Sequence, residues 1–160
     1  MKRVLLKSVH DAFDYVMEHY YPFGMREMAP MQDTYAVISI QDSHCGGFGF
    51  EFTVNEFCKG VLTLRFDDIV DEVEGAELFS DEQAESIIDF VTEYSPMVDT
   101  LLVHCYAGQS RSRAVAAAVM DMKGRDSSVY LESGSANAHV YDTLYAAWVR
   151  RVLNPNIGIN

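Results

Sequence analysis

The stretch Leu101–Met120 constrains the fold of this chain more than any other. It opens with the apolar run Leu101–Val103, passes through a short polar loop and continues into small and apolar residues from Ala114 onward. The apolar run predicts a buried strand, and the small residues predict a helix. A strand, a loop and a helix N-terminus in succession direct backbone N–H groups and the positive end of the helix dipole to one point. The loop is therefore expected to bind an oxyanion.

The polar loop carries a cysteine and an arginine at a spacing that suits phosphate chemistry. Five residues separate Cys105 from Arg111, and Ser112 comes directly after the arginine. The planar guanidinium of Arg111 can hold two phosphate oxygens at once. The same positive surroundings favour the thiolate form of Cys105, which is its nucleophilic form. A thiolate that faces a bound phosphate is placed for phosphoryl transfer.

The nine residues at positions 104–112 resemble the HCxxGxxR[ST] signature of the cysteine-dependent protein tyrosine and dual-specificity phosphatases. The positions that the signature fixes all agree, and they are His104, Cys105, Gly108, Arg111 and Ser112. Beyond the loop, the resemblance covers the order of strands and helices over roughly residues 35–122. It implies an α/β fold and a hydrolase that needs neither a metal nor a cofactor.

The resemblance also implies a role for each residue of the loop. Cys105 is expected to be the nucleophile, Ser112 to donate a hydrogen bond to the departing thiolate, and His104 to orient the loop. The phosphate oxygens are expected to contact Arg111 and the residues between it and the cysteine, which are Tyr106, Ala107, Gly108, Gln109 and Ser110. An ordinary satisfied histidine at a strand end remains an equal alternative for His104.

A second His-Cys pair in the chain lacks these features. His44 and Cys45 are succeeded by two glycines, but the position six after the cysteine is Glu51. A carboxylate at that position repels phosphate. The segment is therefore interpreted as part of a loop over residues 41–57, whose Phe48, Phe50, Phe52 and Phe57 are expected to cover the core.

The general acid is sought among the carboxylates after the predicted strand Val61–Phe66. Asp67 and Asp68 come directly after it, and strand alternation places their side chains on opposite sides. The dual-specificity pattern, in which one polar residue precedes the acid, selects Asp68, 37 positions before Cys105. Asp67 as the acid, or Asp71 or Glu72 on a mobile loop, remains as an alternative.

Strand and helix signals alternate along the remainder of the chain. Ser8 and Ser80 are predicted N-caps, and Asn137 is expected to cap a last helix. The predicted strands are 2–7, 35–40, 61–66 and 99–103, and the predicted helices are 10–20, one beginning after Ser80, one after Arg111 and 138–153. Phe13, Val16, Met17 and Tyr20 are expected to form the apolar stripe of the first helix, and Val152 is expected to face inward in the last, after a connection over 127–136. This alternation predicts a single α/β domain over residues 1–160, with a mainly parallel central sheet and helices on both faces.

Composition narrows the classes of function. The formal net charge of −12 disfavours nucleic acid and anionic membranes as partners. We find no apolar run of membrane-spanning length and no signal peptide. An odd number of cysteines, three, indicates a reducing cytoplasm, although a reversible disulfide of Cys45 or Cys58 with Cys105 stays open.

The function expected from the sequence is hydrolysis of phosphate monoesters in a phosphorylated protein or peptide, on tyrosine, with serine and threonine left open as further targets. Tyr106 and Gln109, the variable loop positions, are not basic, whereas relatives that act on highly phosphorylated inositides tend to carry basic residues there. The alternatives are a phosphatase acting on a phosphoinositide or an RNA 5′-triphosphate, a rhodanese-like sulfurtransferase and a non-catalytic phosphate-binding module.

Overall fold

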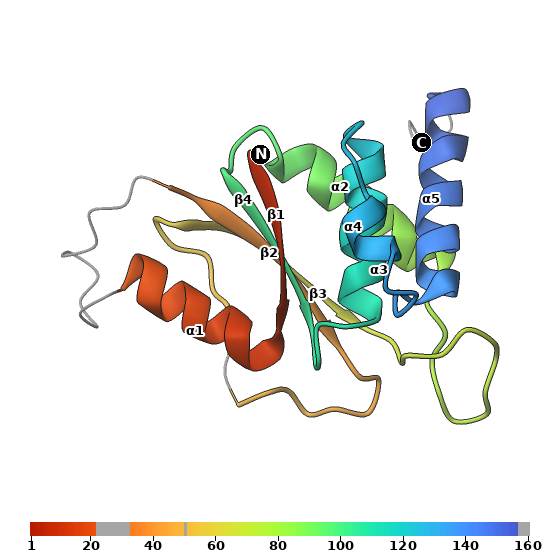
Figure 1. Ribbon diagram of the computed structural model, residues 1–160, viewed down its shortest axis with the longest axis horizontal. Helices are drawn as coiled ribbons and strands as arrows, with labels where there is room; N and C mark the ends of the chain where they lie inside the picture. The colour runs from red at the N-terminus through yellow and green to blue at the C-terminus, as the bar shows by residue number, and fades with distance from the viewer. Residues whose placement is uncertain (22–32, 50, 157–160) are drawn as a thin grey trace.

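A computed structural model describes residues 1–21, 33–49 and 51–156, which form a layered α/β structure around one sheet (Figure 1). The four strands are all parallel and lie in the order β1-β4-β2-β3. Their bounds are Arg3–Ser8 for β1, Tyr35–Gln41 for β2, Cys58–Arg65 for β3 and Thr100–Cys105 for β4. The prediction of a mainly parallel sheet is confirmed.

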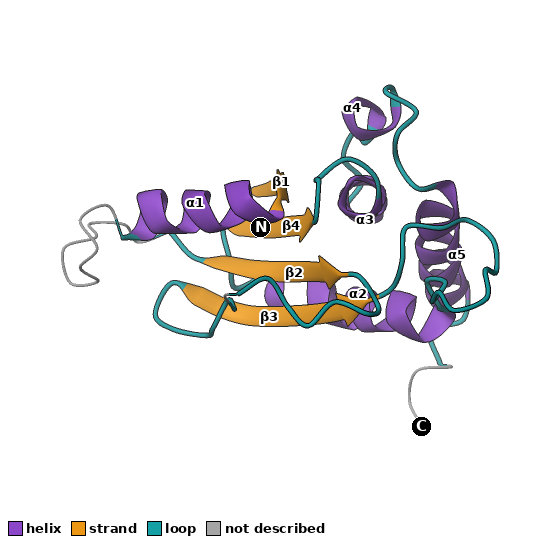
Figure 2. Ribbon diagram, turned by 90° about the horizontal axis from the view of Figure 1, so that it is seen from below, coloured by secondary structure: helices purple, strands orange, loops and turns teal. Residues whose placement is uncertain are grey.

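Helices cover both faces of this sheet, as predicted (Figure 2). α1 (Val9–Tyr20) lies on one face. α2 (Asp81–Tyr94) and α3 (Arg111–Met122) lie on the other, and α5 (Ala138–Leu153) packs against both of them. The one-turn helix α4 (Ser128–Leu131) packs against α3.

The main core lies between the sheet and the helices α2, α3 and α5. The strands contribute Ala36, Ile38 and Ile40 from β2, and Leu101 and Val103 from β4. The helix α3 presents a run of buried small residues, which lets its backbone approach the sheet closely. The strand β2 is buried along its whole length because it is central and covered on both faces.

A smaller core lies under α1 on the opposite face, where Val37 and Leu102 meet Ala12, Val16 and Tyr20. The Ser8 side chain caps this helix by accepting a hydrogen bond from the Asp11 N–H, as predicted. The predicted apolar stripe is wrong in two places, since Phe13 and Met17 are exposed. The helix is rotated so that Val9 and Ala12, rather than these larger side chains, face the sheet.

Other local predictions have mixed outcomes. The capping box of Ser80 with Gln83 and the Asn137 cap are both present. The strand β3 begins three residues earlier than predicted, and the connection over 127–136 contains α4. Val152 is 56% exposed, because α5 extends beyond the core at its C-terminal end. Phe57 is buried as predicted and Phe52 partly so, whereas Phe50 lies outside the described residues.

The carboxyl ends of all four strands meet at one edge of the sheet, where open α/β sheets bind their ligands. Cys105 is the last residue of β4, and Gln41 and Arg65 are the last residues of β2 and β3. The part of the chain that the structure describes contains no helix long and apolar enough to cross a membrane.

Candidate active site

The side chain of Cys105 lies at the floor of the loop between β4 and α3 and is 3% exposed. Its sulfur is 3.0 Å from the hydroxyl oxygen of Ser112, in the first turn of α3. The backbone N–H of Gly108 donates to the same sulfur at 3.2 Å. Two residues that the sequence singled out thus contact the sulfur of Cys105, and both can stabilise a negative charge on it.

The loop takes its shape partly from the junction of β1 and α1. Gly108 has a φ of +71°, and a Cβ atom there would lie 2.6 Å from the backbone nitrogen of Ser8. The N–H of Val9 donates to the carbonyl of Tyr106 at 3.1 Å. Only glycine satisfies both the left-handed backbone and this close approach, so position 108 is fixed by geometry.

The N-terminus of α3 is open at the loop. Its N-cap residue, Ser110, makes no side-chain capping hydrogen bond, whereas α1, α2 and α5 are each capped by a side chain. The Ser110 hydroxyl donates instead to Asp68 at 2.7 Å. The N–H groups of the first turn are therefore left for another acceptor, and an anion above Cys105 suits them.

Arg111 is 5% exposed and is held by two oxygens outside the loop. Its Nη1 donates to the carbonyl oxygen of Phe66 at 2.8 Å and pairs with Asp42 at 2.6 Å. Its Nε is buried and has no hydrogen-bond partner among the described residues. A buried donor without a partner is costly, and a phosphate oxygen in the loop would satisfy it.

Asp42 was not among the predicted site residues. It comes directly after β2, at the same edge of the sheet as the other strand ends, and is about half exposed. The rule that directed attention to the residues after Val61–Phe66 applies equally to β2, and it would have found this carboxylate. Its role in the structure is to fix the guanidinium of Arg111.

The two aspartates after β3 point to different partners. Asp67 accepts hydrogen bonds from the hydroxyl and N–H of Ser43 and from the N–H of Glu77. These bonds, that of the Ser43 hydroxyl foremost, hold the pKa of Asp67 below its usual value. Asp68 instead turns to the loop and accepts from Ser110. The two side chains therefore point to different partners, as predicted, although β3 ends at Arg65 and both lie beyond it. Of the two, only Asp68 contacts the loop that contains Cys105.

Asn137 is a second residue of the site that the sequence did not mark as functional. Its side-chain oxygen caps α5 by accepting from Val140, as predicted from sequence. Its amide nitrogen donates to Asp68 at 2.8 Å and to the Ile69 carbonyl at 3.1 Å. One side chain thus connects the start of α5 with Asp68, over a separation of 69 residues.

His104 is fully buried on the opposite face of the sheet from Cys105. Its Nδ1 lies 3.3 Å from the Cys105 carbonyl, and its Nε2 has no partner among the described residues. The rings of Phe48 and Phe52 pack against the imidazole. Burial lowers the pKa of His104, which favours the neutral ring. These contacts fit a positioning role for the imidazole and give it no route to a phosphate.

The remaining loop side chains lie on the surface. Tyr106 is exposed, with its ring 6.5 Å from that of Phe48, and Gln109 accepts a hydrogen bond from Arg113. A cleft of about 560 Å³ lies beside Asp68. It is lined by Asp68, Ile69, Val70, Asp71, Val73, Ser110 and residues 135–138.

The three cysteines are free, and the sheet register separates two of them. Cys58 is paired with Tyr35, which is paired with Thr100. Thr100 lies five residues before Cys105, so the two cysteines are roughly 16 Å apart along the strands. Disulfides need Cα atoms within about 7 Å, and Cys58 therefore cannot pair with Cys105 in this fold. The described residues contain no cluster of three or more His, Cys, Asp or Glu side chains that could hold a metal.

Solved structures with the same fold include tyrosine and dual-specificity phosphatases and a human tyrosine phosphatase-like serine/threonine/tyrosine-interacting protein. The structure is similar to DUSP15 (21% identity, 100% of this chain and 96% of that one, TM-score 0.52). It is also similar to human DUSP28 (16%, 94% and 94%, 0.53) and to PTPMT1 in complex with PI(5)P (16%, 95% and 94%, 0.51). No family model and no curated protein matches the sequence. The resemblance that nine loop residues indicated therefore extends to the fold of nearly the whole chain.

Proposed function

We propose that this protein hydrolyses phosphate monoesters through a phosphocysteine intermediate. One observation carries the proposal: the sulfur of Cys105 faces the open N-terminus of α3 beside Arg111, whose buried Nε lacks an acceptor. A phosphate dianion supplies acceptors to both groups and presents its phosphorus to the sulfur. The sulfurtransferase alternative does not account for a carboxylate held at the rim of the loop.

In the first step, the thiolate of Cys105 attacks phosphorus in line with the ester oxygen. The S–P bond forms as the P–O bond to the leaving group breaks. Arg111 and the loop N–H groups hold the three remaining oxygens while charge redistributes. Asp68, in its protonated form, gives its proton to the leaving oxygen.

In the second step, water attacks the phosphocysteine. The carboxylate of Asp68 takes a proton from the water, the O–P bond forms and the S–P bond breaks. The Ser112 hydroxyl, 3.0 Å from the sulfur, donates a hydrogen bond to the departing thiolate. Inorganic phosphate leaves, and Asp68 is protonated again for the next cycle.

The surroundings of the loop favour a phosphorylated protein, with phosphotyrosine as its preferred residue. The exposed ring of Tyr106 stands beside the loop and can contact the ring of phosphotyrosine. The adjoining cleft combines apolar Val70 and Val73 with the carboxylate of Asp71, which suits a peptide and repels a polyanion. Hydrolysis of phosphoserine or phosphothreonine at a lower rate fits the same geometry. The thiolate chemistry requires a reducing compartment, and we assign the protein to the cytoplasm on that ground.

A phosphoinositide is the second candidate substrate, because the PTPMT1 structure with the same fold contains PI(5)P. The acidic rim and the neutral Tyr106 and Gln109 oppose a highly charged headgroup. The acidic rim should repel an RNA 5′-triphosphate even more strongly, because RNA carries more negative charges.

The test is a turnover screen of an aryl phosphate, matched phosphotyrosine, phosphoserine and phosphothreonine peptides, PI(5)P and an RNA 5′-triphosphate. We expect the aryl phosphate and the phosphotyrosine peptide to be hydrolysed fastest. Acid-quenched Cys105→Ser protein should carry no phosphate on residue 105 under conditions in which the unsubstituted chain does. Faster turnover of lipid or RNA than of every peptide would overturn the substrate assignment, and no turnover of any ester would overturn the activity.

A further inference from the structure

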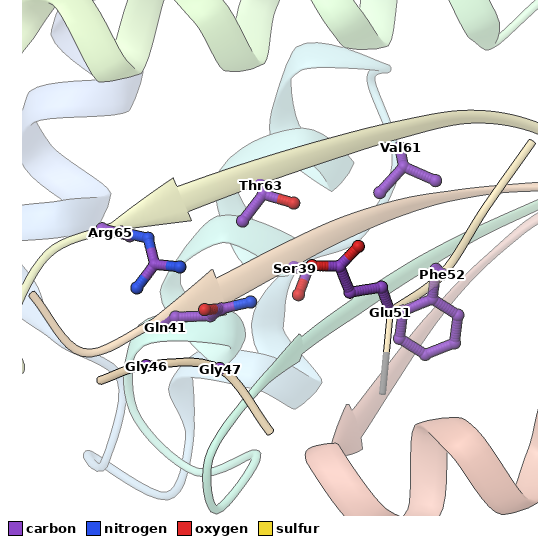
Figure 3. Close-up of a pocket in the computed structure, with 9 residues that line it drawn as sticks. All are labelled: Ser39, Gln41, Gly46, Gly47, Glu51, Phe52, Val61, Thr63 and Arg65. Atoms are coloured by element: carbon purple, nitrogen blue, oxygen red, sulfur yellow. The ribbon is translucent and has the colours of Figure 1, made fainter. Parts of the chain in front are cut away.

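A second cavity lies on the α1 face of the sheet, behind the strand ends (Figure 3). It has a volume of about 280 Å³ and is covered by the chain segments around Gly47 and Phe52. Ser39, Gln41, Thr63 and Arg65 form its floor, with side chains that all come from β2 and β3. None of these four residues belongs to the loop between β4 and α3 that holds Cys105, which is called the phosphate loop below.

The floor of this cavity is polar at a place where a sheet face is usually apolar. Ser39 is 4% exposed and Gln41 is 7% exposed. The side-chain oxygen of Gln41 is buried without a hydrogen-bond partner among the described residues. An unsatisfied buried carbonyl is costly, and nearer α1 the same face is covered by apolar contacts such as that of Val37. The polar residues therefore need an explanation other than packing.

The cavity contains one positive and one negative side chain. Figure 3 shows Arg65 at one end and Phe52 at the other, with the carboxylate of Glu51 reaching toward Ser39 in the middle. Gln41 lies between Arg65 and Ser39 in this view. The guanidinium of Arg65 donates to the carbonyl of Cys45, which is a neutral acceptor. No ion pair joins Arg65 or Glu51 to an opposite charge within the described ranges.

We propose that this cavity binds a small zwitterion with one carboxylate and one ammonium group, the chemical class of the free α-amino acids. The carboxylate pairs with Arg65, whose planar fork suits two carboxylate oxygens. The ammonium pairs with Glu51 and supplies the missing donor to the oxygen of Gln41. Val61 and Phe52 form an apolar wall for the side chain of the ligand.

Size and charge both favour this class. The volume lies just below the ~300–1,000 Å³ that is usual for ligand pockets, so the ligand is small. A ligand with only a negative charge would be repelled by Glu51, and a ligand with only a positive charge would be repelled by Arg65. A zwitterion satisfies both, and its net charge of zero avoids the repulsion that a chain of net charge −12 exerts on anions.

The site adjoins the residues that support the phosphate loop. Ser39 is the register partner of His104, and Phe52 contacts both the cavity and the imidazole ring. A ligand that contacts Phe52 can therefore affect the packing of His104, the residue before Cys105. Resonances of His104 are thus expected to move when the cavity is occupied.

Binding is tested by NMR titration of the full chain with each of the common amino acids. We expect at least one to bind and to shift resonances of Gln41, Thr63 and His104. Arg65→Met and Glu51→Gln should each weaken binding by about tenfold or more, since each removes a charge-assisted contact. Arg150→Met and Glu93→Gln, which remove the same charges on the distant helices α5 and α2, should leave the affinity unchanged.

The ligand itself provides the second arm of the test. The N-acetyl derivative lacks the ammonium and the methyl ester lacks the carboxylate, so both should bind at least about tenfold more weakly than the parent amino acid. Thr63→Phe, which places an aromatic ring in the cavity from an exposed strand position, should abolish binding. Absence of binding by every amino acid, equal binding of the N-acetyl derivative, or undiminished binding to Arg65→Met would each overturn the proposal. These readouts do not depend on phosphate ester turnover, so the outcome is independent of the proposed activity.

Discussion

Two His-Cys pairs lie at or after the ends of two neighbouring strands of the same sheet, and only one of them lies at the N-terminus of a helix. His44 and Cys45 lie in the loop after β2, and His104 and Cys105 lie at the end of β4, sixty positions later. The sulfur of Cys45 exchanges weak local hydrogen bonds with the backbone of Gly47. The sulfur of Cys105 contacts a loop N–H and a helix hydroxyl.

The difference comes from the chain segment on the C-terminal side of each cysteine. A helix begins six residues after Cys105, at Arg111, whereas an irregular segment with Glu51 at the same spacing comes after Cys45. The helix supplies N–H groups without a side-chain cap and the buried guanidinium of Arg111. The backbone at the end of β1 packs closely against Gly108 in the loop. A His-Cys pair in the sequence therefore does not by itself indicate a reactive cysteine. The elements packed around it decide whether a thiolate can face an anion.

The largest effect is expected from a matched pair of cysteine substitutions. Cys105→Ser should reduce aryl phosphate turnover by roughly 10⁴ or more, because the hydroxyl is a poor nucleophile at neutral pH. Cys45→Ser should leave turnover within about twofold of the unsubstituted chain, since the surface position tolerates change. Steady-state kinetics of the two variants measures this. Comparable losses in both would contradict the contrast between the two loops.

A second matched pair concerns the aspartates after β3. Asp68→Asn should reduce turnover of an ester with a poor leaving group by about 10²–10⁴, because the proton donor is lost. The loss should be smaller with an activated aryl phosphate, whose phenolate leaves without a proton. Asp67→Asn should retain activity, but it should lower the free energy of unfolding at neutral pH.

The pH dependence of the Asp67 effect has a defined sign. The pKa of Asp67 is lowered in the folded chain, so its carboxylate stabilises the fold above its ordinary pKa and loses that contribution as the pH falls through the folded value. Urea denaturation should therefore show the Asp67→Asn difference near neutral pH and none in strong acid. If Asp67→Asn rather than Asp68→Asn shows the dependence on leaving group, the roles are reversed.

A smaller effect is expected at Ser112, whose counterpart in the other loop is Phe52. Ser112→Ala should slow breakdown of the phosphocysteine by about five- to tenfold, the equivalent of one hydrogen bond of roughly 1 kcal/mol. Rapid-mix kinetics with an aryl phosphate should then show a burst. Ser133→Ala, at an exposed position, is the control and should show none. An unchanged rate without a burst would remove Ser112 from the second step.

The smallest expected effect is the pH dependence of stability that His104 contributes. Burial lowers the pKa of His104 in the folded chain, so the unfolded chain binds a proton more readily. The free energy of unfolding should be highest above the ordinary histidine pKa of about 6.5 and should decrease as the pH falls below it. The total decrease is about 1.4 kcal/mol for each unit between the pKa of His104 in the unfolded chain and that in the folded chain. His104→Gln should reduce this dependence, measured by urea denaturation at a series of pH values. An equal slope for the variant and the unsubstituted chain would contradict it.

The sequence predicted the features that local patterns encode. The strand, loop and helix around Cys105, the capping box at Ser80 and the cap at Asn137 each depend on residues within a few positions of one another. The ion pair of Asp42 with Arg111 and the hydrogen bond of Asn137 to Asp68 could not be predicted, because each joins residues about seventy positions apart. The exposure of Phe13 and Met17 has a similar origin, since the sheet selects which face of an amphipathic helix is buried.

The pairing of β1 with β4 has a consequence for how the chain is made. The Arg3 side chain donates to the Thr100 hydroxyl, a partner 97 residues later. At a synthesis rate of about 5–20 residues per second, β1 is made roughly 5–20 s before β4, its neighbour among the described strands. Gly108 can settle against Ser8 only after that strand has docked. A nascent chain therefore contains its first strand early but completes the loop between β4 and α3 late.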